Sequence, residues 1–127
     1  MNKTSYNKNH KQVLDTILGR IKGVEPGKMF GFPAYYIEGR LFACVYGDGV
    51  GVKVPESLAR KLLEKEHVVP FQPMGKPRMR EWVQLNRSRS SDYERDEDVF
   101  AASVKHVSSL NKKAGTGPAN RRTDERQ

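Results

Sequence analysis

The residues best suited to chemistry lie in one basic stretch, residues 76–89. Its charge balance is 5 − 1 = +4, from these residues: Lys76, Arg78, Arg80, Arg87, Arg89 and Glu81. Alternation along a predicted strand puts Arg80, Trp82 and Gln84 on one face. An Arg beside an exposed Trp could grip a nucleic-acid backbone and stack a base. The alternative, which we favour, is a core-packed Trp82 with arginines that are solvated or paired with the acidic start of the last helix.

Other reactive side chains are scattered along the chain. The three histidines, His10, His67 and His106, show no paired spacing, and Cys44 is the single cysteine. A structural zinc site needs about four ligands, usually in close pairs. Cys44 lies between apolar residues, which favours a buried thiol over an activated nucleophile. With no Gly-x-Ser-x-Gly motif either, we expect no catalytic residue, no metal, no cofactor and no enzymatic activity.

A glycine-rich segment, GDGVG at residues 47–51, offers a second candidate for anion binding. A phosphate-binding loop leads into a helix, so that backbone N–H groups point at the anion. Here the glycines lead into a predicted strand instead. The segment is therefore interpreted as a turn between two strands.

Length and composition indicate one globular domain with a basic surplus. The chain has 127 residues, 36% of them hydrophobic and 30% charged, and its net charge is +8. The C-terminal residues 111–127 contribute 5 − 2 = +3 of that charge. No apolar run reaches the roughly twenty residues that span a bilayer, and the polar N-terminus lacks the apolar region of a signal peptide. We expect a cytoplasmic protein without membrane contact, whose charge is compatible with nucleic acid or another acidic partner.

The apolar spacing predicts three helices and four strands. A helix is expected at residues 11–22, from apolar residues at three- and four-residue steps. Residues 34–38 and 41–46 are expected to form a hairpin, followed by a strand at residues 50–54. Pro55 suits the first turn of a second helix.

The second half of the chain contains the clearest helix signal. Residues 79–85 are expected to form the fourth strand. Ser91 followed by Glu94 is a capping-box pattern, which predicts a last helix that fades near Leu110. Residues 1–10 are expected to be flexible, 11–110 to fold, and 111–127 to form a disordered basic tail. The predicted fold is α+β, a two-layer sandwich of an antiparallel sheet (a meander plus a further strand) with helices packed against it.

Several short sequence motifs, in this order, resemble those of the N-terminal domain family of TfoX (also called Sxy), the bacterial competence regulator. They are KMFG (28–31), YIEGRLFA (36–43), VKV (52–54), PF (70–71), GKP (75–77) and MREWV (79–83). The resemblance covers roughly residues 13–110. The sequence departs from the family at residues 32–33, where Phe-Pro stands in place of a Tyr- or Gly-rich segment. TfoX also carries a C-terminal domain of helices that this sequence does not contain, so the role of the whole regulator is not implied.

The resemblance implies a regulatory or adaptor domain without enzymatic activity. Its motif residues are interpreted as structural, with Met29 and Phe30 building the core and Gly31 permitting a bend: Met29, Phe30, Gly31, Gly39 and Trp82. We expect a protein partner, with an exposed sheet edge as one docking surface and a homodimer as a further possibility. The alternative is a weak nucleic-acid-binding module that uses residues 76–89 and the tail.

Overall fold

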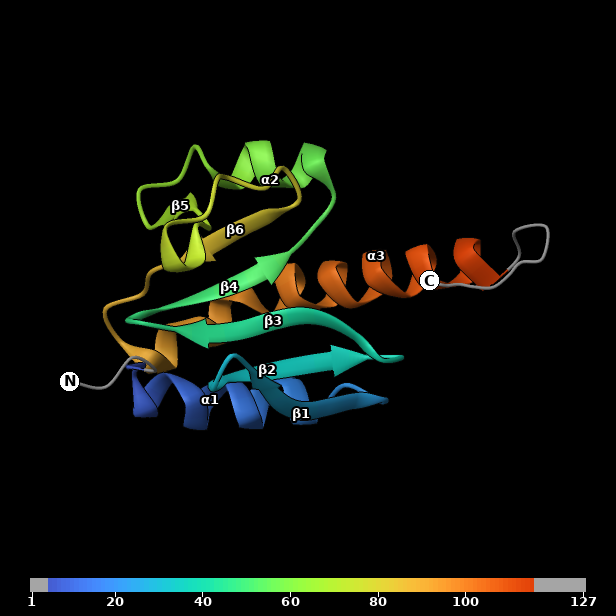
Figure 1. The fold of residues 1–127 in the computed structure, drawn as a ribbon. Helices are drawn as coiled ribbons and strands as arrows, with labels where there is room; N and C mark the ends of the chain where they lie inside the picture. Colours follow the sequence, from blue (N-terminus) through green and yellow to red (C-terminus); the bar gives the residue numbers. More distant parts are fainter. Residues whose placement is uncertain (1–4, 116–127) are drawn as a thin grey trace.

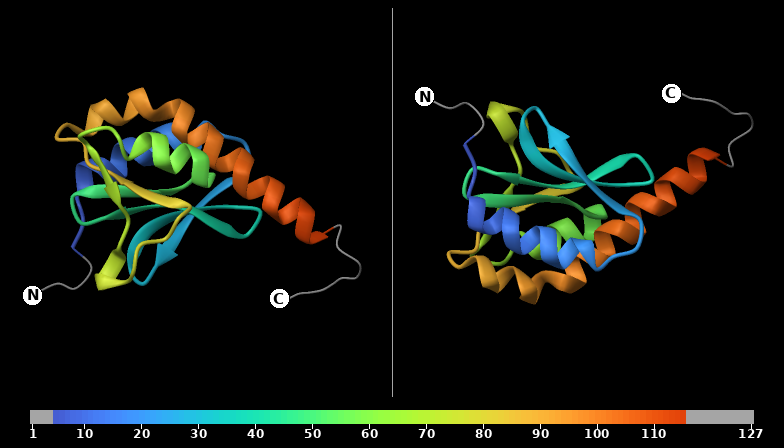
Figure 2. Two further views of the ribbon diagram at one scale, coloured as in Figure 1. Left: turned by 90° about the horizontal axis from the view of Figure 1, so that it is seen from above. Right: turned by 90° about the horizontal axis from the view of Figure 1, so that it is seen from below.

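Six strands form one antiparallel sheet, and three α-helices cover one of its faces, in the computed structural model that describes residues 5–115 (Figures 1 and 2). This is the two-layer α+β fold that the sequence predicts. The strands lie in the order β1-β2-β3-β4-β6-β5. Their bounds are β1 Val24–Met29, β2 Phe32–Ile37, β3 Arg40–Tyr46, β4 Gly49–Lys53, β5 Val68–Pro70 and β6 Trp82–Leu85.

The first helix, α1 (Lys8–Gly19), begins earlier than residue 11, where the sequence predicted its start. The reason is a local cap, because the Asn7 side chain accepts a hydrogen bond from the His10 backbone N–H at 3.0 Å. His10 itself is fully buried. The predicted flexible segment thus joins the fold by Asn7 and His10, while its residues 1–4 lie outside the described part of the chain.

Two strands, β1 and β5, were not predicted. The sequence of β1, VEPGKM, contains Pro and Gly and has the composition of a loop. It nevertheless pairs with β2 along its whole length, from Val24 opposite Ile37 to Met29 opposite Phe32. β5 is three residues long and pairs with β6. In both cases the strand is defined by its hydrogen-bonded neighbour rather than by its own alternation.

A register shift changes which side chains of β3 face the helices. Tyr35 pairs with Ala43 and Tyr36 pairs with Leu41, so Phe42 is the extra residue of a β-bulge. Phe42 consequently packs beside Ala43 in the core under the helices, whereas Leu41 lies on the opposite face. Strict alternation along a strand would place Phe42 and Ala43 on different faces.

The last helical segment starts as a 3-10 helix, η2 (Ser90–Asp96), and continues as α3 (Glu97–Gly115). No side-chain cap bond forms at the start of η2, so the capping box predicted at Ser91 is not made. The backbone of α3 runs beyond the predicted end at Leu110. The rest of the predicted tail, residues 116–127, lies outside the described residues.

The core lies between the sheet and the helices α1, α2 (Glu56–Leu62) and α3. Its largest fully buried members come from α1, the sheet, η2 and α3: Leu14, Ile17, Leu18, Phe42, Leu85, Tyr93 and Phe100.

A second, smaller cluster lies on the opposite face of the sheet. It is centred on Phe71, whose ring packs directly over Gly51, where an added Cβ would lie 2.8 Å from the ring. No helix of the described residues is long and apolar enough to cross a membrane.

Candidate functional site

The Met29-Phe30-Gly31 motif forms the turn between β1 and β2. Met29 and Phe32 are the last paired residues, and Phe30 (φ 51°) and Gly31 (φ 88°) occupy the loop. Two successive positive φ angles in a two-residue hairpin loop define a type I′ turn. The side chain of Phe30 lies beyond the sheet and is 68% exposed. The interpretation of Phe30 as a core residue is therefore wrong, whereas Met29 is half-buried against the Phe71 cluster.

Two other turns share this backbone geometry. Glu38 (φ 52°) precedes Gly39, and Met74 (φ 55°) precedes Gly75 in the short 3-10 helix η1 (Pro73–Gly75). Among the described residues, these two and Phe30 are the non-glycine residues with positive φ. Two of the three, Phe30 and Met74, are also large exposed apolar residues, because Met74 is 50% exposed and Phe30 is 68% exposed. Bulky side chains are outliers in this conformation, which costs roughly 1–2 kcal/mol.

The β1–β2 turn and η1 lie on the same side of the sheet, away from the helices (Figure 2). The Lys76 Nζ atom lies 5.6 Å from the centre of the Phe30 ring. The Met74 backbone N–H donates a hydrogen bond of 2.8 Å to the Tyr46 hydroxyl. The Tyr46 ring in turn lies 4.8 Å from the ring of Phe32, next to the β1–β2 turn. The β1–β2 turn and η1 are thus joined through Tyr46 and Lys76.

Exposed cations accompany these two apolar side chains in the sequence. Lys28 precedes the β1–β2 turn, and Lys76, Arg78 and Arg80 follow η1. All four are exposed, and none forms an ion pair with a described residue. Lys28 lines the pocket against α1, on the other side of the sheet. We call the set Phe30, Met74, Lys76, Arg78 and Arg80 the Phe30–Met74 surface.

The other members of the predicted basic stretch do not belong to this surface. Arg87 binds Asp96 through two hydrogen bonds, from Nε at 3.1 Å and from Nη2 at 2.7 Å, and this pair holds the pKa of Arg87 above its ordinary value. Arg89 is exposed and immediately precedes η2. The Trp82 ring is half-buried and lies 5.4 Å from the Phe71 ring. The structure thus divides the stretch into a surface part, residues 76–80, and a structural part that includes Trp82 and Arg87.

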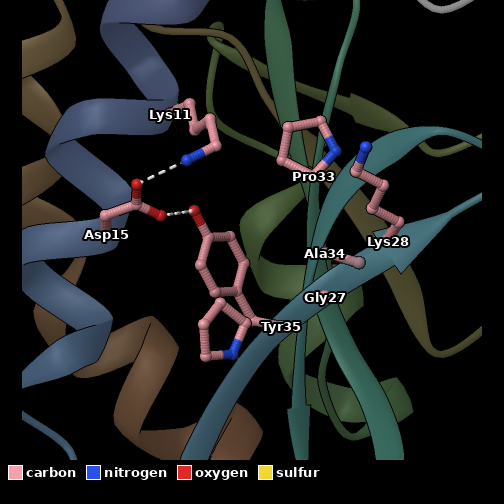
Figure 3. A pocket seen from close by; sticks show the side chains of 8 residues that line it. Lys11, Asp15, Gly27, Lys28, Pro33, Ala34 and Tyr35 are labelled. Atoms are coloured by element: carbon pink, nitrogen blue, oxygen red, sulfur yellow. Dashed lines mark hydrogen bonds and ion pairs between the residues drawn. The ribbon is translucent and has the colours of Figure 1, made fainter.

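A shallow pocket of about 240 Å³ lies between α1 and the strands β1 and β2 (Figure 3). Three of its polar side chains bind one another. The Tyr35 hydroxyl donates to one Asp15 oxygen at 2.6 Å, and the other oxygen binds Lys11 Nζ at 2.7 Å. Burial, and secondarily this Asp15 contact, raise the pKa of Tyr35, so its hydroxyl stays protonated. The pocket is consistent with a structural link between α1 and β2 rather than with acid–base chemistry.

A second polar cluster contains the residue types of a serine hydrolase. His10 Nδ1 lies 2.6 Å from the Ser90 Oγ atom, and Nε2 lies 3.6 Å from a carboxylate oxygen of Asp48. The imidazole is completely buried against Tyr93, however, while the Asp48 side chain is 84% exposed. In a catalytic triad the carboxylate is buried and holds the histidine ring in position, which a solvent-exposed carboxylate does poorly. We interpret the cluster as a polar link between α1, the β3–β4 turn and η2.

Reactive groups elsewhere are held in unreactive states. Burial raises the pKa of the Cys44 thiol to about 12, which leaves little thiolate at neutral pH. No group of three potential metal ligands occurs among the described residues. The glycine segment at residues 47–51 forms the β3–β4 turn and the start of β4, and a strand follows it as expected.

The family model of the TfoX N-terminal domain matches residues 16–107. The chain therefore belongs to the TfoX N-terminal domain family, which is not a known enzyme family. Searches of curated proteins and of solved structures gave no match.

Sequence reasoning found the cations of the Phe30–Met74 surface but missed its apolar members. A signal was present, because Phe30, Glu38 and Met74 each precede a glycine. A glycine at the second central position supplies one of the two positive φ angles that a type I′ turn requires. Interpreted as a turn signal, the KMFG motif predicts a hairpin tip with an exposed Phe30 rather than an entry to the core.

Proposed function

We propose that this chain is a non-enzymatic regulatory or adaptor domain that acts through protein contacts, in the cytoplasm. One observation carries the proposal. Phe30 and Met74 each combine an unfavourable backbone conformation with an exposed apolar side chain, and contacts of Lys76 and Tyr46 link the two turns that carry them. Violations of local rules concentrate at functional sites. A binding partner that covers both side chains would offset the cost of exposing them.

The sheet edges are less suitable docking surfaces than we expected from the sequence. The two edge strands are β1 and β5, and each contains a proline, Pro26 and Pro70. Proline has no backbone N–H to donate, and it is one of the devices that protect edge strands from pairing. The proposal therefore places the contact on the Phe30–Met74 surface, and it assigns no role to dimerisation through an edge.

Site-specific photo-crosslinking in living cells tests the proposal. A photoreactive phenylalanine analogue replaces Phe30 in one chain and Glu38 in a matched control, since both positions begin a two-residue turn of the same geometry. We expect a discrete protein adduct from position 30 and none from position 38. The purified adduct partner should then bind the full chain saturably, with little dependence on salt. Equal adducts from both positions would contradict the proposal.

A second candidate function is weak binding of nucleic acid. It is supported by the exposure of Lys76, Arg78 and Arg80, which form no ion pair with a described residue. The tail cations that were part of this hypothesis lie outside the residues whose side chains are described. Fluorescence anisotropy with labelled oligonucleotides across a salt series tests it. Affinity that falls steeply with salt and disappears in an Arg78→Ala/Arg80→Ala variant would favour this function over protein contacts.

A further inference from the structure

The Phe30–Met74 surface carries charge of one sign. The two segments that build it, residues 29–31 and 73–80, contain no Asp or Glu. Elsewhere in the described chain, several cations are neutralised by neighbouring carboxylates: Lys11 by Asp15, Arg20 by Glu94 and Glu97, Lys53 by Glu81, Arg60 by Glu56, and Arg87 by Asp96. The surface thus combines exposed apolar area with cations that no described carboxylate neutralises.

Building on the proposed function, we infer that the partner segment that binds this surface is an acidic peptide segment with apolar side chains between its carboxylates. The apolar side chains cover Phe30 and Met74, which removes apolar area from water. The carboxylates pair with Lys76 and with the guanidinium groups of Arg78 and Arg80, which suit carboxylates because they donate two parallel hydrogen bonds. Such charge complementarity favours fast association and excludes basic partners.

The geometry favours this partner over single-stranded nucleic acid. Stacking of bases needs open aromatic faces. Here the Lys76 ammonium lies over the Phe30 ring, and the Trp82 ring packs with Phe71. Met74, the other exposed apolar member, has no aromatic face at all. Its flexible thioether suits apolar side chains of a peptide instead.

Nuclear magnetic resonance titration of the isotope-labelled full chain tests the inference. The probe is a synthetic peptide in which glutamates alternate with leucines and tryptophan. Three comparison ligands are the same peptide with glutamine in place of glutamate, a polyglutamate of equal length, and a single-stranded oligothymidylate. We expect the acidic apolar peptide to bind most tightly and to shift the amide signals of residues 28–31 and 73–80.

Variants with matched controls locate the binding. Phe30→Asn and Met74→Asn remove the apolar side chains and introduce asparagine, a residue that tolerates positive φ. Each should weaken binding by about tenfold or more, as expected for a hot-spot residue. The matched control is Val69→Asn, because Val69 is an exposed apolar residue of β5. For charge, the triple Lys76→Gln/Arg78→Gln/Arg80→Gln is compared with Lys22→Gln/Lys61→Gln/Lys65→Gln, which removes three exposed cations elsewhere.

The outcomes separate the inference from the proposed function. Losses confined to the variants of the Phe30–Met74 surface support the inference. Equal losses in the control variants, equally tight binding of the glutamine peptide or the polyglutamate, or tighter binding of the oligothymidylate would overturn it. If photo-crosslinking at position 30 still yields a protein partner while the acidic peptide fails to bind, the inference is wrong and the proposed function stands. If crosslinking yields no protein partner, the proposed function itself fails.

Discussion

The two faces of the sheet differ in how completely their side chains are buried and hydrogen-bonded. Under the helices, Phe42, Tyr93 and Phe100 are fully buried, and the polar groups among them have partners. The Tyr93 hydroxyl donates to the Leu85 carbonyl at 2.9 Å and accepts the Arg87 backbone N–H at 3.2 Å. Apart from the buried His10 Nε2 atom, which has no hydrogen-bond partner, this side therefore obeys the usual rules of a core: apolar groups are buried and buried polar groups are hydrogen-bonded.

The opposite face obeys these rules only near its centre. Phe71 is buried over Gly51 and packs with the half-buried Trp82. Toward the β1–β2 turn and η1, the same face ends in exposed Phe30 and Met74. A monomer gains nothing from exposed apolar side chains in strained backbone. The helix-covered face thus holds most of the core, whereas the exposed end of the opposite face is the basis of the proposed partner contact.

The largest expected effect is on the helix-covered face. Replacement of buried Phe42 by Ala should lower the free energy of unfolding by about 3–5 kcal/mol, because it leaves a cavity in the core. Phe30→Ala is the matched change on the opposite face, and it should alter stability by less than about 0.5 kcal/mol, because the side chain is exposed. Urea denaturation followed by the fluorescence of Trp82, the single tryptophan, measures both. Similar values for the two variants would contradict the contrast between the faces.

Alkaline pH should lower the free energy of unfolding through titratable groups on both faces of the sheet, and the contributions of Cys44 and Tyr93 can be separated. Burial raises the pKa of Cys44 from 9.0 to about 12, and burial likewise raises that of Tyr93 from 10.0 to about 12. The unfolded chain therefore loses these protons first as pH rises. The stabilisation is fully present below about pH 9 and is lost toward pH 12, by up to about 1.4 kcal/mol per pH unit for each group.

Denaturation at several pH values checks this prediction. Cys44→Ala should remove the pH dependence that begins near pH 9, which reports on the Phe71 cluster. Tyr93→Phe should reduce the part that begins near pH 10, and the remainder belongs to Tyr35, whose pKa burial also raises; both tyrosines report on the core under the helices. Unchanged slopes in both variants would show that other groups cause the alkaline loss.

The Arg87–Asp96 pair should be worth more than any cation of the Phe30–Met74 surface. Asp96→Asn removes the charge of a nearly buried carboxylate that accepts two hydrogen bonds from Arg87. We expect a loss of about 2–3 kcal/mol in thermal or urea unfolding. Arg78→Gln, at an exposed cation without a described ion pair, should change stability by less than about 0.5 kcal/mol. A comparable loss in Arg78→Gln would mean that the surface cations stabilise the fold.

The smallest effect should have the opposite sign. Phe30→Asn places a residue that tolerates positive φ at the first position of the type I′ turn. Stability should rise by about 0.5–1 kcal/mol, because a strained conformation is relieved. The same change should weaken partner binding. A variant that loses stability would show that Phe30 supports the fold, which would remove the main argument for a contact at this position.

The sequence by itself determined the fold class and most of its elements. Helical periodicity near Leu14 and Ile17, the hairpin around Gly39 and the proline before α2 all depend on neighbours along the chain. Local spacing and turn chemistry therefore predicted them, and the family resemblance agrees with the match at residues 16–107. The basic stretch at residues 76–80 was also visible, because charge can be counted without coordinates.

Only the tertiary structure decided what pairs and what is exposed. β1 and β5 are strands because their neighbours in the sheet supply hydrogen bonds, and the bulge at Phe42 redirects side chains through a register that no local pattern specifies. Arg87 binds Asp96 within the acidic start of the last helical segment, and only folding decided which of those carboxylates it meets. Phe30 and Met74 are forty-four positions apart (74 − 30 = 44), and only folding brings their turns together.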